Sequence, residues 1–185
     1  MLGVGNCVKS LPAEQRQRIE SGYSKELLHA LYETDQNAWH PIAVWKEALD
    51  VIVASSGDPK VARTTVRSAG RFICERTVNT FLKLLMRIMT PALFAKKSGS
   101  MIGKDFRGFV GGAPDYFCDL SKLDQKEITM GVRRAADFPY LGGTGQGFIE
   151  FAMHYMGMQD VLIDEPGCAP DEWAPENVSW RIRWK

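Results

Sequence analysis

No apolar run in this sequence is long enough to cross a membrane. Its 185 residues contain no stretch near the ~18 consecutive apolar residues that a transmembrane helix needs. Residues 1–22 also lack the basic start and the apolar middle of a secretory signal. We therefore expect no membrane span and a cytoplasmic location.

An excess of charge of one sign is missing as well. The chain has 23 Lys and Arg against 22 Asp and Glu, so its formal net charge is +1. Binding to nucleic acid relies on clustered cations that no nearby acid compensates. The sequence therefore predicts no nucleic-acid partner.

Paired cysteines and the common catalytic motifs are absent. The four cysteines are far apart and form no C-x-x-C pair, which predicts reduced thiols and no zinc site. The chain also has no G-x-S-x-G elbow and no Ser/His/Asp or Cys/His spacing typical of a hydrolase. We predict that the protein is not an enzyme and that it holds no metal or other cofactor.

Helical periodicity is what the first hundred residues do have. Ser10 followed by Pro12 is typical of a helix start, and so is Thr90 followed by Pro91. Between these points runs a long apolar stripe, formed by Val66, Ala69, Ile73, Phe81, Leu84, Leu85 and Ile88. We expect it to cover a sheet, although Lys83, Arg87, Lys96 and Lys97 also suit a basic helix lying on a membrane surface.

Short segments with β character fill most of the second half. They are residues 114–123, 126–134, 160–167 and 177–185. One helix separates the first two from the last two, so the order is β-β-α-β-β. This predicts a single α+β domain over 1–185, with 1–100 mainly helical and 101–185 forming a roughly four-stranded antiparallel sheet plus one helix. The last segment alternates apolar and polar residues, which predicts a strand with one buried and one solvent-facing side. For an assembly module, we expect this strand at a sheet edge.

The glycine-rich stretch 141–147, LGGTGQG, precedes that helix. Its glycines are spaced Gly143-x-Gly145-x-Gly147, which matches neither a dinucleotide fingerprint nor a P-loop. We predict a turn in which the glycines permit positive φ angles and close packing at the helix start. Anion binding at free helix N–H groups is the alternative.

The helix that follows carries the candidate ligand site. Three of its aromatic residues share one face, and the long apolar stripe could supply further walls of an apolar pocket. The candidate pocket residues are Phe148, Phe151, Tyr155, Phe81 and Leu85. Core packing is the alternative role for all five.

A polar pair lies on the same helix. Glu150 and His154 stand one turn apart, where a carboxylate could orient an imidazole for metal binding or proton transfer. Two such groups do not make a complete site, and a solvent-facing pair is the alternative. We therefore predict no metal there.

Several segments from about Trp39 to the end resemble an uncharacterised family of myxobacterial paralogues. They are VARTTVRSAGRFICERTVNTFLKLLMRIMTP, FRGFVGGAPDY, GQGFIEFAMHYMG, DVLIDE and VSWRIRW. That family is distantly similar to the nitric-oxide-signalling and Golgi-transport fold. The fold includes haem nitric-oxide-binding domains, vinyl-reductase-type sensors and Bet3-related trafficking subunits.

The resemblance implies helices on one side of an antiparallel four-stranded sheet. It also implies a non-catalytic sensor that binds a small hydrophobic ligand between helices and sheet, or alternatively an assembly module that forms a homodimer or binds a protein partner. The haem-binding branch joins its proximal histidine with a Tyr-x-Ser-x-Arg motif. This sequence has no such motif, so the resemblance does not extend to haem.

Overall fold

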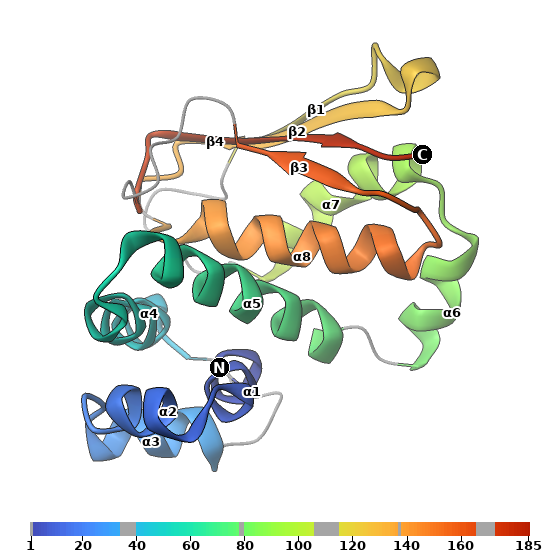
Figure 1. Cartoon of the computed structure of the whole chain (residues 1–185). Helices are drawn as coiled ribbons and strands as arrows, with labels where there is room; N and C mark the ends of the chain where they lie inside the picture. Colours follow the sequence, from blue (N-terminus) through green and yellow to red (C-terminus); the bar gives the residue numbers. More distant parts are fainter. Residues whose placement is uncertain (1, 34–39, 78–79, 106–114, 137, 166–172) are drawn as a thin grey trace. The chain divides into compact units, whose positions relative to one another are not determined.

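The computed structural model describes six stretches of the chain, which are residues 2–33, 40–77, 80–105, 115–136, 138–165 and 173–185 (Figure 1). Their contacts group them into two compact units. The first unit comprises 1–78 with 143–151, and the second comprises 79–142 with 152–185. The single domain expected over 1–185 stays a prediction.

The first unit is helical. Its helices are α1 (Leu2–Ser10), α2 (Ala13–Glu20), α3 (Lys25–Tyr32), α4 (Ile42–Ser56), α5 (Pro59–Thr77) and the middle of α8 (Leu141–Tyr155). Helix α1 packs against α5, and α4 packs against α5 as well. Fully buried aliphatic side chains form the core, and among them are Val4, Val8, Leu31, Leu49, Ile52 and Val66. This burial is the main stabilising contribution.

Ser10 does not begin a helix, contrary to the prediction. Its hydroxyl donates a hydrogen bond of 2.7 Å to the carbonyl of Cys7, within the last turn of α1. Helix α2 begins at Ala13, with Pro12 as its N-cap. The sequence misled because residues 2–10 are themselves helical, so Ser10 binds backward to a carbonyl instead of forward to an N–H.

The second unit contains the sheet. Helices α6 (Thr80–Ile88) and α7 (Pro91–Asp105) precede four strands, which are β1 (Asp115–Asp119), β2 (Glu127–Arg133), β3 (Leu162–Asp164) and β4 (Asn177–Arg183). The strand order is β1-β2-β4-β3, and every neighbouring pair is antiparallel. With α8 between β2 and β3, the predicted β-β-α-β-β order and the α+β class are confirmed.

The last strand lies in the middle of the sheet, so the prediction of an edge strand was wrong. β4 pairs with β2 on one side and with β3 on the other. The buried and solvent-facing sides that the alternation predicts are confirmed, because Val178, Trp180 and Ile182 are buried on one face while Arg181 and Arg183 are exposed on the other. A period of two reports which face is buried and does not report the place of a strand in its sheet.

Thr90 begins α7 as predicted. Its hydroxyl accepts a hydrogen bond of 3.2 Å from the N–H of Leu93, and Pro91 is the first helical residue. The preceding helix departs from prediction, since Leu84 is 66% exposed, Leu85 37% and Ile88 77%. These three residues of the stripe therefore do not cover the sheet.

The glycine-rich stretch is helix rather than turn. Residues 141–147 form the first two turns of α8, and none of their glycines has a positive φ. The expectation of close packing is confirmed instead. A methyl group on Gly147 would overlap the carbonyl oxygen of Arg67, and one on Gly70 would overlap the carbonyl oxygen of Thr144. Because glycine has no side chain, the backbones of α5 and α8 come into contact at Gly70 and Gly147.

Candidate functional site

Three aromatic side chains on α8 are only half-buried. These are Phe148, Phe151 and Tyr155, the three pocket candidates that the sequence placed on this helix. The other two candidates, Phe81 and Leu85, lie on α6. Leu85 is exposed, and the side chain of Phe81 lies outside the described residues. Phe148 and Phe151 belong to the first unit, whereas the other three belong to the second.

An arginine guanidinium lies near each of two of these rings. The Arg71 guanidinium lies 5.9 Å from the ring centroid of Phe151, within the first unit. In the second unit, the Arg87 guanidinium lies 5.6 Å from the ring centroid of Tyr155. Each is a cation–π contact worth about 0.5–1 kcal/mol at an exposed site. The arrangement gives α8 aromatic faces bordered by positive charge.

Glu150 binds an arginine that the sequence did not indicate. The Arg67 Nε lies 2.9 Å from Glu150 Oε2, and its Nη2 lies 2.7 Å from Oε1. This forked pair joins α5 to α8 beside the glycine contacts. His154, one turn further along α8, is exposed. Both carboxylate oxygens of Glu150 thus face Arg67, and the proposed role of Glu150 and His154 as a polar pair stays a prediction.

Within the second unit, a side chain of the sheet forms a hydrogen bond to the first turn of α8. The indole Nε1 of Trp180 donates to the carbonyl of Gly142 at 2.9 Å and lies 3.2 Å from Glu165 Oε1. Tyr140 precedes the helix with φ 68° and donates its N–H to the carbonyl of Trp173. The Glu165 carboxylate beside Gly142 makes this helix start unfavourable for an anionic ligand, because like charges repel.

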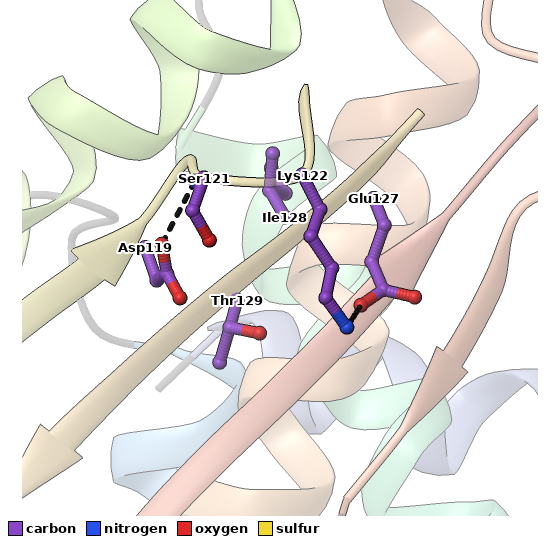
Figure 2. A pocket seen from close by; sticks show the side chains of 6 residues that line it. All are labelled: Asp119, Ser121, Lys122, Glu127, Ile128 and Thr129. Atoms are coloured by element: carbon purple, nitrogen blue, oxygen red, sulfur yellow. Dashed lines mark hydrogen bonds and ion pairs between the residues drawn. The ribbon is translucent and has the colours of Figure 1, made fainter. Parts of the chain in front are cut away.

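A small polar notch lies on the β1–β2 hairpin (Figure 2). Its volume is about 60 Å³, and its lining residues are Asp119, Ser121, Lys122, Glu127, Ile128 and Thr129. Lys122 Nζ lies 3.1 Å from Glu127 Oε1, and the Ser121 N–H donates to Asp119 at 2.8 Å, which lowers the pKa of that carboxyl. The notch has the volume of a few water molecules, and its charged side chains already have an ion-pair or hydrogen-bond partner beside it.

Metal-ligating groups do not gather in the described part of the chain. No three His, Cys, Asp or Glu side chains there lie close enough to hold an ion. Cys7 and Cys74 are buried in the helical unit, and Cys118 is half-buried on β1. Cys168 lies outside the described residues.

Burial raises the pKa of two of the thiols. It raises the pKa of Cys7 to about 12 and that of Cys74 to about 12, with the carboxylate of Glu75 as a smaller cause for Cys74. The thiolate is the nucleophile, so at pH 8 both should be alkylated about a thousandfold more slowly than an ordinary thiol. Iodoacetamide labelling of the native protein followed by peptide mass spectrometry tests this, with half-buried Cys118 as the internal comparison. Fast labelling of Cys7 or Cys74 would contradict it.

Solved structures of H-NOX proteins share this fold. An H-NOX protein from S. oneidensis in the Fe(II)NO ligation state aligns over 100% of this chain and 99% of its own, at 13% identity and a TM-score of 0.64. An oxygen-binding H-NOX domain related to soluble guanylate cyclases aligns over 99% and 92%, at 12% identity and a TM-score of 0.64. The unliganded Fe(II) H-NOX protein from K. algicida aligns over 100% and 97%, at 10% identity and a TM-score of 0.63.

The likeness establishes the fold and confirms the distant similarity that the sequence motifs implied. No protein-family model matches the sequence, and a comparison with curated proteins gives no match. At identities of 10–13% a shared fold does not carry a shared ligand. The haem of the neighbours therefore has to be tested against the residues of this chain.

The histidines of this chain do not fit haem. Haem iron needs an axial ligand buried against the porphyrin, most often a histidine. His29 is exposed and lies 2.8 Å from Glu33, and His154 is exposed on α8. His40, the third and last histidine, is half-buried at the approach to α4. Two of the three histidines are thus exposed to solvent, unlike a buried haem ligand.

Proposed function

We propose that this protein is a non-catalytic sensor module in which the H-NOX fold binds a small apolar ligand directly, without haem. The observation that carries the proposal is the row of half-buried aromatic rings on α8, at Phe148, Phe151 and Tyr155. Aromatic side chains are usually buried in a filled core. Rings left half-accessible along one helix are suited to contact with an apolar ligand.

The solved neighbours support a ligand-binding use of this fold. One is an H-NOX protein in the Fe(II)NO ligation state, another is an H-NOX domain in complex with oxygen, and the H-NOX from Shewanella woodyi is in the Fe(II)CO state with IWP-051 bound. Those ligands belong to those proteins. For this chain, two exposed histidines and one half-buried histidine favour an apolar ligand that contacts the α8 rings themselves.

A catalytic role has little support in the described residues. Glu150 is held by Arg67, and Asp164 is held by Arg181 and Arg183 at 3.1 and 2.6 Å. Carboxylates paired in this way are poor general bases, because the arginine stabilises their charged form. We therefore propose regulation rather than catalysis.

Thermal unfolding with a panel of apolar ligands tests the proposal. A ligand that binds only the folded state stabilises it by about 2.7 kcal/mol when present at a hundred times its dissociation constant. Phe151→Leu and Tyr155→Leu should reduce that stabilisation. Phe117→Leu is the matched control, because Phe117 is another half-buried aromatic residue but lies on β1.

Two results would sink the idea. One is an unchanged melting temperature across fatty acids, retinoids, sterols and small aromatic compounds. The other is a histidine-dependent Soret band after haem is added, lost in His154→Ala or His40→Ala, which would show haem ligation after all.

An assembly module is the alternative, and the sheet edge favours it. β3 is an outer strand of the sheet, and its Leu162 is 59% exposed. An exposed apolar side chain on an outer strand offers a contact to a second chain. Light scattering across a concentration series separates the two, since self-association lost in Leu162→Lys would favour assembly.

A further inference from the structure

Several apolar side chains on the segment from α6 into α7 are exposed to solvent. Leu84 and Ile88 are one turn apart on α6 and are 66% and 77% exposed, and Leu85 beside them is 37% exposed. Leu93 on α7 is 43% exposed. Four of the seven large apolar side chains found exposed in the described residues thus lie within ten positions of one another. We call these four residues the α6–α7 apolar surface.

The same segment carries the charge asymmetry of the whole chain. Residues 79–104 contain five Lys or Arg and no Asp or Glu, which leaves 18 basic against 22 acidic residues elsewhere. Lys96 and Lys97 are exposed and stand three and four positions after Leu93, so they share its helix face. Arg87 lies over the Tyr155 ring next to Ile88 in sequence. Residues 79–104 therefore have a formal charge of +5, although the net charge of the whole chain is only +1.

We infer that the α6–α7 apolar surface docks on a bilayer containing anionic lipid. Exposed leucine and isoleucine side chains enter the boundary of the acyl chains, while neighbouring lysines and arginines meet the phosphate and carboxylate headgroups. No helix in the described residues is both long and apolar enough to cross a bilayer. The contact is therefore peripheral and reversible.

The geometry favours a lipid surface over other occupants. Ile88 and Leu84 protrude from a single short helix, which suits insertion into a soft layer more than the flat contact that a folded partner offers. A second copy docked through the same surface would bring the exposed Lys96 and Lys97 of both copies near each other. That repulsion is unfavourable at physiological ionic strength, where the screening length is about 8 Å.

Vesicle sedimentation of the full-length chain tests the inference. We expect binding to phosphatidylcholine vesicles that contain phosphatidylserine, and little binding to phosphatidylcholine alone. Lys96→Glu with Lys97→Glu should weaken binding by about thirtyfold or more, since each cation near an anionic surface is worth about fivefold. Leu84→Ser with Ile88→Ser should weaken binding by about tenfold, because the double variant buries less apolar surface in the bilayer.

Matched controls lie on other elements. Lys60→Glu removes an exposed cation of α5, and Leu162→Ser removes an exposed leucine of β3. Both should leave vesicle binding unchanged. All these positions are exposed, so each variant is expected to keep its stability within about 0.5 kcal/mol per substitution, checked by circular dichroism melting.

Four outcomes would overturn the inference. Equal binding to neutral vesicles would show that charge does not contribute to binding. No binding to anionic vesicles at low salt would show that the α6–α7 apolar surface does not dock on a bilayer. Anionic binding that survives Leu84→Ser with Ile88→Ser would indicate a charge-only surface, as for an acidic protein partner. Self-association lost in the same variants, without vesicle binding, would assign the surface to a second copy.

Discussion

Replacing Gly147 by alanine should destabilise the protein by about 3 kcal/mol, although alanine is the better helix former. In an unconstrained helix interior the change would stabilise by about 0.5–1 kcal/mol. Here the added methyl group would overlap the Arg67 carbonyl oxygen and lie 3.0 Å from the Arg71 nitrogen. Both atoms are backbone, so no rotamer change relieves the overlap and α5 must move away from α8. Overpacking of this kind costs about 1–3 kcal/mol or more.

Urea unfolding of two further variants makes that prediction specific. In Gly57→Ala the added methyl group has open space around it, and the only strain is the positive φ of 68°. This variant should therefore lower the free energy of unfolding by about 1 kcal/mol. Gly70→Ala overlaps the Thr144 carbonyl from the other helix, and combined with Gly147→Ala it should cost less than the sum of the two. Once the helices have parted, the second methyl group meets less resistance. A Gly147→Ala protein as stable as the parent would refute the contact.

The sequence predicted the helix of the second half but not what its glycines do. Four glycines in six residues are typical of a turn, because glycine is the weakest helix former after proline. Tertiary contact overrides that preference here, since Gly143 and Gly147 face α5 where any side chain would collide. Gly70 is the only sequence sign of the partner helix, and it lies more than seventy residues away.

Arg67, Arg71 and Arg87 could not be assigned from sequence for a related reason. Local spacing predicts pairs three or four residues apart, such as Lys46 and Asp50, whose charged atoms lie 2.6 Å apart. The partners of these arginines are Glu150, Phe151 and Tyr155, which the fold alone brings near. Such contacts require the packing of α6 and α8 or α5 and α8 to be known first.

The apolar stripe shows the opposite limitation. Periodicity predicted one continuous covering face from Val66 to Ile88, and Val66 and Ala69 are indeed fully buried. Beyond the described end of α5 the same spacing continues, but Leu84 and Ile88 are exposed. Period 3.6 identifies an apolar face and does not say whether protein covers it. The absence of acidic residues over 79–104 is the sequence feature that distinguishes the two parts.

Trp180→Ala should be the most damaging change in the sheet, at about 3–5 kcal/mol. Trp180 is 2% exposed at the centre of β4, opposite Met130 of β2, and truncation would leave a cavity that strands paired on both sides cannot close. Trp180→Phe keeps an aromatic ring but removes the Nε1 donor, so the hydrogen bond to the Gly142 carbonyl is lost at about 0.5–1.5 kcal/mol. Trp184→Phe is the control, because Trp184 lies beyond the end of β4 and is only half-buried. The urea midpoint should therefore be highest for Trp184→Phe, lower for Trp180→Phe and lowest for Trp180→Ala. Equal midpoints for the two phenylalanine variants would show that the indole N–H does not hold the start of α8.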